Sequence, residues 1–204
     1  MKVLVACEFS GVVRDAFNSH GHKAMSCDLL ASDTQGPHFM GDVLSILNDG
    51  WDLMIAHPPC TYLCQASNAH MGSFRPHLKV PENRVKSAAF FMALVNAPIE
   101  WIAVENPIGC MSSLYRKPDQ IVRPFMFGHP FRKDICLWLK NLPKLVRTHA
   151  TEPSLFEQVI EGNYRKKLDF WSDKRNPGGR SLKSITFQGI ADAMADQWGG
   201  LCPK

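Results

Sequence analysis

The stretch IAHPPCTYLCQ (55–65) places a cysteine directly behind two prolines and a short apolar run. The prolines end the apolar run and stiffen the backbone that carries Cys60. A thiolate held in this way is a strong nucleophile if its pKa is lowered or if a base lies close to it. Many cysteines are instead inert, buried residues, so the stretch alone leaves both interpretations open.

A carboxylate stands in a comparable place behind another apolar run. Glu105, Asn106 and Pro107 follow EWIAVE (100–105). A carboxylate at the end of a strand can form a cap or bind a metal. It can also hydrogen-bond a heterocycle when burial raises its pKa. A cysteine and a carboxylate on neighbouring strand ends can therefore act on one substrate ring.

Three further positions favour an adenosine-containing cofactor. The EFSG turn (8–11) brings the chain close to a ligand with a helix behind it, although Gly11 alone is not a dinucleotide signature and a plain strand–helix turn stays open. Asp28 can accept hydrogen bonds from ribose hydroxyls, and Asp42, in GDV, from an adenine amine. Each aspartate can equally cap the segment that follows it. It is the three positions together, in this order, that point to adenosine.

The elements that must position these residues follow an alternating pattern. Apolar runs predict strands at 2–9, 22–28, 51–56, 100–105 and 135–139, and helices are expected at 12–21, 44–50, 82–97 and 189–200. Strands that alternate with helices predict an α/β fold with a mostly parallel twisted sheet and helices on both faces. Ligands of such sheets bind at the carboxyl ends of the strands. The polar residues that follow the strands should therefore gather along one edge.

The length, composition and charge of the chain narrow the class of protein. A chain of 204 residues with 45% hydrophobic content suits a single domain, 1–204, with a loop-rich insertion at 148–184. No apolar stretch is long enough for a membrane span, and MKVLVACEFSG is better explained as a first strand than as a signal peptide. Seven cysteines without CxxC spacing predict no disulfide framework, no metal site and a cytoplasmic location. The net charge of +4 tolerates a polyanionic partner without requiring one.

Taken in order, these motifs resemble the cytosine-5 DNA methyltransferase family. FSG resembles its F-x-G-x-G motif, HPPC its G-P-P-C-Q nucleophile loop, and VENP its E-N-V motif, with Val13 and Thr61 in place of a glycine and the glutamine. FGHPFRKDICLWL (127–139) resembles Y-G-x-P-Q-x-R-x-R before a strand, although Phe131, Lys133 and Ile135 replace its glutamine and arginines. FQGIADAMADQW (187–198) is similar to the family's final helix.

The resemblance implies a Rossmann-like class I methyltransferase fold and transfer of methyl from S-adenosyl-L-methionine to carbon 5 of cytosine. Cys60 would be the nucleophile, and Glu105 would hydrogen-bond the ring. The cofactor would contact Phe9, Ser10, Gly11, Asp28, Leu29, Asp42, Val43 and Pro58. The substrate or DNA would contact Pro59, Asn106, Arg132, Lys133, Arg165 and Arg180, of which the basic residues can equally be solvated surface.

Two departures from the family pattern keep alternatives open. The segment 148–184 is much shorter than the family's target-recognition region, and the base-contacting positions 131–135 are altered. The chain resembles the small, minimal versions found in bacteriophage genomes. These would act on duplex or single-stranded DNA in a bacterial or phage-infected cell, alone or with a partner subunit for target recognition.

Three rival functions also remain. A free cytosine nucleotide or RNA would need no recognition region. An amino methyltransferase would carry a [D/N/S]-P-P-[Y/F] loop, which His57 and Cys60 fit poorly. A non-catalytic DNA- or cofactor-binding relative would explain the altered 131–135 segment, but not the retention of Cys60 and Glu105.

Overall fold

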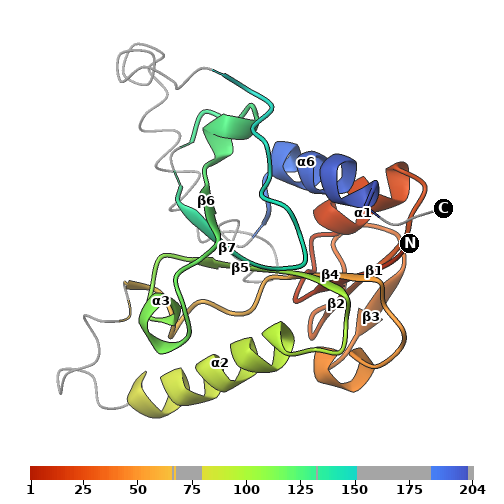
Figure 1. The fold of residues 1–204 in the computed structure, drawn as a ribbon. Coiled ribbons are helices and arrows are strands. Elements are labelled where there is room, and N and C mark those ends of the chain that lie inside the picture. The colour runs from red at the N-terminus through yellow and green to blue at the C-terminus, as the bar shows by residue number, and fades with distance from the viewer. Residues whose placement is uncertain (66, 68–79, 132, 151–184, 202–204) are drawn as a thin grey trace.

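A seven-stranded sheet organises the protein (Figure 1). The computed structural model describes residues 1–65, 67, 80–131, 133–150 and 185–201. The strands lie in the order β3-β2-β1-β4-β5-β7-β6. Their bounds are β1 Lys2–Ala6, β2 Lys23–Asp28, β3 His38–Met40, β4 Leu53–Ala56, β5 Trp101–Pro107, β6 Gln120–Val122 and β7 Ile135–Lys140.

Five neighbouring strands, β3, β2, β1, β4 and β5, pair in parallel, while β7 runs antiparallel to both β5 and β6. The order proceeds outward in both directions from the β1–β4 pair, which is the switch point of a doubly wound fold. The α/β, Rossmann-like class predicted from the sequence is therefore confirmed.

Helices cover both faces of the sheet, as Figure 1 shows: α1 (Val12–Ser19) and α6 (Gln188–Gly199) on one face, α2 (Val80–Val95) and α3 (Met111–Leu114) on the other. Alternate residues of β1 divide the core between the two faces, because successive side chains of a strand point to opposite sides. Val3 and Val5 belong to one apolar cluster, and Leu4 and Ala6 to the other. The helices thus bury the sheet and leave its strand ends for other contacts.

Two short strands and several element ends differ from the sequence-based prediction. The first strand ends at Ala6 rather than residue 9, because Cys7 adopts a left-handed backbone with φ 59°. β3 and β6 were not predicted, since three residues are too few to carry an alternating pattern. The short helix expected at 44–50 is a 3₁₀ helix over Val43–Ile46, and α2 begins at Val80. Of the insertion predicted at 148–184, residues 151–184 lie outside the described residues.

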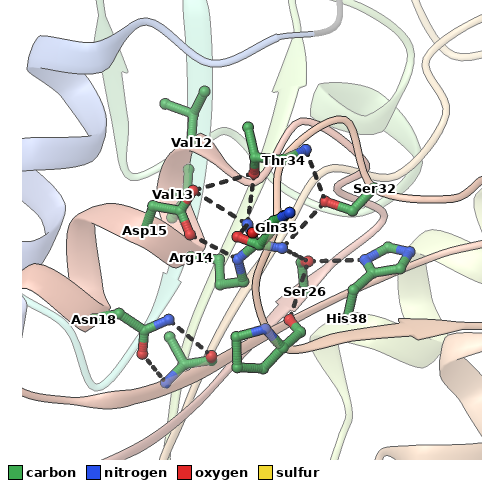
Figure 2. A network of polar contacts seen from close by, with 12 residues as sticks. Val12, Val13, Arg14, Asp15, Asn18, Ser26, Ser32, Thr34, Gln35 and His38 are labelled. Carbon is green, nitrogen blue, oxygen red and sulfur yellow. Dashed lines mark hydrogen bonds and ion pairs between the residues drawn. The ribbon is translucent and has the colours of Figure 1, made fainter.

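A buried arginine ties the loop after β2 to α1 (Figure 2). Arg14, on α1, is fully buried, and its guanidinium donates to Ser26 on β2 and to Ser32, Thr34 and the Gln35 carbonyl of the loop. It also pairs with the half-exposed Asp15. A buried guanidinium is tolerated only when its donors are paired, so this loop and the helix must be ordered together.

Replacing Arg14 with methionine should lower the free energy of unfolding by about 2 kcal/mol, because buried Ser26 and the loop acceptors lose the donor that joins them to α1. Urea denaturation followed by circular dichroism measures the change. The same substitution at the exposed Arg147 is the matched control and should shift stability by no more than about 0.5 kcal/mol. Equal effects at the two positions would show that the Arg14 network contributes no stability.

Candidate active site

The segment that follows β4 and the last residues of β5 meet in a cavity of about 200 Å³. The parallel register pairs Ala56 with Val104, so the next residues of the two strands lie side by side at their carboxyl ends. Five of the predicted catalytic and substrate-binding residues line this cavity together: Pro59, Cys60, Glu105, Asn106 and Lys133. The sheet therefore brings residues from three separate motifs to one place.

A turn closed by backbone hydrogen bonds holds Cys60. The Cys60 carbonyl accepts from the amides of Leu63 and Cys64, both at 3.0 Å. Behind it, the Pro58 carbonyl accepts from Asn106 Nδ2 at 2.9 Å, which ties the proline loop to the end of β5. Cys60 is exposed, whereas the other cysteines that the structure describes are buried or half-buried.

The surroundings of Cys60 keep its thiol protonated at rest. Burial raises the pKa of Cys60, and the nearby Cys64 and Glu105 add to this, while Lys133 lowers it. Together these effects raise the pKa of Cys60 above the ordinary value of a cysteine. A cysteine in this state is a weak nucleophile, because the thiolate is the reactive form.

A largely buried histidine–carboxylate pair also lines the cavity. His57 Nδ1 lies 2.7 Å from Glu105 Oε2, and their side chains are 8% and 15% exposed. Burial acts to raise the pKa of Glu105, but the hydrogen bond and charge of His57, with Lys133, outweigh it and lower that pKa below its ordinary value. Burial was the one influence on this pKa that the sequence suggested, because the sequence does not reveal the partner that outweighs it.

His57 is a site residue that the sequence-based prediction did not include. Its position in HPPC is the signal that was available, because the resembled G-P-P-C loop has glycine there. Burial acts to lower the pKa of His57, yet the hydrogen bond and charge of Glu105, with Glu8, raise it above its ordinary value. Among the described residues, His57 Nε2 and Asn106 Oδ1 are buried without a hydrogen-bond partner.

A second cavity, of about 300 Å³, lies at the carboxyl ends of β1 and β2. Asp28, Leu29, Asp42 and Val43, four of the predicted cofactor residues, line it, and so does Leu44. Asp28 and Asp42 each also accept a backbone N–H two residues on, at 2.9 and 3.0 Å, so the capping interpretation holds as well. Pro59 lines both cavities, which therefore adjoin.

The first turn is occupied by a carboxylate of the protein itself. Buried Glu8 accepts from the amides of Val13 at 2.7 Å and Arg14 at 3.3 Å, at the beginning of α1. Two amides that could hold a phosphate at this helix N-terminus are thus already paired. This feature separates the turn from the dinucleotide-binding type.

Four other predicted cofactor residues do not line the second cavity. Phe9 and Ser10 are buried, and Gly11 has φ 79° with Thr34 and the Arg14 guanidinium where a Cβ would stand. Pro58 lines the first cavity instead. Their contact with a cofactor stays a prediction.

Some predictions fall outside what the structure describes. Arg132, Arg165 and Arg180 belong to the segments without description. Within the described ranges, no group of three or more His, Cys, Asp or Glu side chains could hold a metal ion. The helices in those ranges are all too short or too polar to cross a membrane.

Comparisons with known proteins give little beyond this geometry. No family model matches the chain, and no curated protein matches it. Among solved structures, the chain is similar to an E. coli protein that is encoded within a prophage and provisionally described as a DNA modification methyltransferase. The TM-score is 0.46 at 14% identity, over 78% of this chain and 54% of that one. The chain thus spans about half of that protein's length.

Cys60 should be the first of the described cysteines to react with iodoacetamide in the native protein, because it alone among them is exposed. Burial raises the pKa of Cys27 to about 12 and that of Cys136 to about 11, and both side chains are buried. The rate at Cys60 should keep rising above pH 9, since its own pKa is raised. Peptide mass spectrometry after timed labelling measures each rate. Faster labelling of Cys27 or Cys136 would contradict the described site.

Proposed function

We propose that the protein transfers a methyl group from S-adenosyl-L-methionine to carbon 5 of a cytosine, with Cys60 as the nucleophile. One observation carries the proposal. An exposed thiol and an ionised carboxylate, from neighbouring strand ends, face one cavity, and a single proline separates it from a second cavity lined by two acids. The first cavity suits a ring that is attacked covalently, and the second suits an adenosine.

The second cavity fits S-adenosylmethionine in its donor chemistry. Asp28 would accept from the ribose hydroxyls and Asp42 from the adenine amine, while Leu29 and Leu44 supply apolar surface to the base. Leu29 is 75% exposed, so a ligand would cover apolar surface that now faces water. Glu8 pairs with the first amides of α1, which argues for a cofactor without phosphates. When bound, this cofactor supplies an electrophilic methyl group.

In the proposed mechanism, Cys60 makes carbon 5 reactive, since that carbon is a poor nucleophile by itself. The Cys60 thiolate adds to carbon 6, which leaves an enamine-like ring whose carbon 5 can take the methyl group. Glu105 hydrogen-bonds the exocyclic amine and ring nitrogen 3 and so stabilises the charge that builds in the ring. Loss of the carbon 5 proton to a base, such as water, then expels Cys60.

DNA is the proposed substrate. Pro59, Asn106 and Lys133 would contact the cytosine base or the phosphates of its strand. A cytosine in a duplex must leave the stack before it can enter a cavity beside Cys60, which costs a few kcal/mol. A single strand, RNA or a free cytosine nucleotide avoids that cost. The short 148–184 segment favours a substrate whose recognition needs few contacts, alone or with a partner subunit.

Incubation with S-adenosylmethionine and, separately, duplex DNA, single-stranded DNA, RNA and cytosine nucleotides should yield 5-methylcytosine, measured by mass spectrometry after digestion. Cys60→Ala should abolish the product, because no other group in the cavity can add to carbon 6. Cys110→Ala, a half-buried cysteine that lines neither cavity, should leave it unchanged. Product that persists in Cys60→Ala would rule out the covalent mechanism. No product from the wild type with any substrate would favour a binding role or a missing partner.

Asp42→Ala should weaken S-adenosylmethionine binding at least about tenfold, which corresponds to the loss of one good hydrogen bond. Isothermal titration calorimetry with the cofactor alone measures this without any methyl acceptor. Asp49→Ala, an exposed aspartate after the same 3₁₀ helix, is the matched control and should bind like the wild type. Unchanged affinity in Asp42→Ala would remove the second cavity as the cofactor site.

A further inference from the structure

We propose that His57 is a positioning residue that fixes Glu105 and stores the proton taken up by ring nitrogen 3 when Cys60 attacks. The inference rests on the proposed function and adds a residue to it. His57 stands where the resembled G-P-P-C loop has glycine. A histidine partner for Glu105 is therefore a feature of this chain and not of the resembled motif.

The backbone holds the two side chains against each other. His57 directly follows β4, and its amide donates to the Ala6 carbonyl of β1 at 2.9 Å, which continues the sheet by one residue. Glu105 belongs to β5, in register one residue beyond Val104, and its Oε2 meets His57 Nδ1 at 2.7 Å. The imidazole is 8% exposed, and its Nε2 has no partner among the described residues, so Glu105 alone orients the ring through hydrogen bonding.

Three charged groups decide whether His57 holds a proton. Glu105, from β5, and Glu8, from the turn after β1, favour protonated His57, while Lys133, from the segment before β7, disfavours it. The pKa of His57 is raised and that of Glu105 is lowered, so both shifts favour an imidazolium beside a carboxylate. Cys60, three residues on, faces the same cavity as a protonated thiol. The resting pair therefore carries one proton, held at His57 Nδ1 against the Glu105 carboxylate.

An ionised carboxylate can only accept hydrogen bonds. It suits the exocyclic amine of cytosine, which donates, but not ring nitrogen 3, which is itself an acceptor until it is protonated. Stable contact with both atoms therefore requires a proton on nitrogen 3. His57 is the group beside Glu105 that can provide it.

The proton transfer balances once the thiol proton is included. The Cys60 S–H bond breaks first and its proton passes to solvent water, since Cys60 is exposed. As the sulfur then bonds to carbon 6, the electron pair displaced in the ring is taken up by nitrogen 3, which forms a bond to hydrogen. The His57 Nδ1–H bond breaks, the Glu105 carboxyl group passes the proton on, and the site is left with neutral imidazole, carboxylate and protonated nitrogen 3. The proton returns by the same route when the thiolate leaves. No oxidation or reduction is involved.

His57→Asn tests the inference, because asparagine retains an N–H donor toward Glu105 but cannot hold a proton. We expect kcat for methylation to fall about 100-fold, as is typical when a proton-transfer group is lost. KM for S-adenosylmethionine should not change, since His57 does not line the cofactor cavity. An unchanged kcat would overturn the proposal. His20→Asn, at the exposed end of α1, is the matched control and should behave like the wild type.

The pH profile separates proton storage from a merely structural role. Because the pKa of His57 is raised, its proton is held below that pKa and lost as the pH rises through it. Deprotonation of Cys60 should raise the activity of both proteins as the pH rises, so it is the ratio of wild-type to His57→Asn activity that should fall through the pKa of His57. If the activity of His57→Asn is lower than that of the wild type by the same factor at every pH, His57 only supports the structure and the proposal is overturned. In a Glu105→Gln background, His57→Asn should cause no further loss of methylation activity if His57 acts through Glu105.

Nitrogen NMR of the His57 imidazole in the free protein measures the protonation of the His57–Glu105 pair without any substrate. His57 should titrate above its ordinary pKa in the wild type and fall back toward it in Glu105→Gln. A neutral His57 ring near pH 7 would overturn the inference even if methylation occurs. A wild type that makes no 5-methylcytosine but titrates as expected would instead refute the proposed function and leave the proton-holding pair established.

Discussion

The parallel pairing of β4 with β5 fixes the geometry on which the candidate site depends. Ala56 and Val104 are opposite each other in the ladder, so His57 and Glu105 emerge side by side at one edge. Both are buried, and a carboxylate that is removed from water needs a partner. The hydrogen bond between them satisfies this need, and it also sets the charge of Glu105 and the protonation of His57. The antiparallel β7, with Ile135 opposite Pro107, then brings Lys133 to the same cavity.

The cofactor side of the sheet depends on a different kind of constraint. Leu29 and Asp42 lie on either side of a loop and a three-residue strand that have little apolar contact of their own. This loop is ordered by polar contacts: Arg14 donates to the Gln35 carbonyl, and the Asp33 amide donates to the Phe9 carbonyl at 2.8 Å. Gly11 permits the close approach of Thr34, because any side chain there would meet it. The predicted cofactor residues of the first turn thus include Gly11, which packs against this loop and does not line the cavity.

The sequence predicted the main strands and their common edge because long apolar runs and the residues behind them are local signals. It could not predict the His57–Glu105 contact, since nothing in HPPC indicates which side chain 48 positions away faces the histidine. The lowering of the Glu105 pKa could not be predicted for the same reason, because it comes from His57. β3 and β6 exist only through pairing with neighbouring strands, and so no local pattern announces them. Asp28 and Asp42 could be located, but sequence alone could not reveal that each both caps a turn and lines a cavity.

The charges around Cys60 couple its thiol to the buried pair. Glu105 raises the pKa of Cys60 and also that of His57, while Lys133 lowers both. Glu105 is therefore the group that the thiol and the imidazole share: its charge holds a proton on each of them, because interacting groups titrate together. In the proposed reaction, a base that pairs with Glu105 would change both environments at once, and so the state of Cys60 and that of His57 would depend on the same carboxylate.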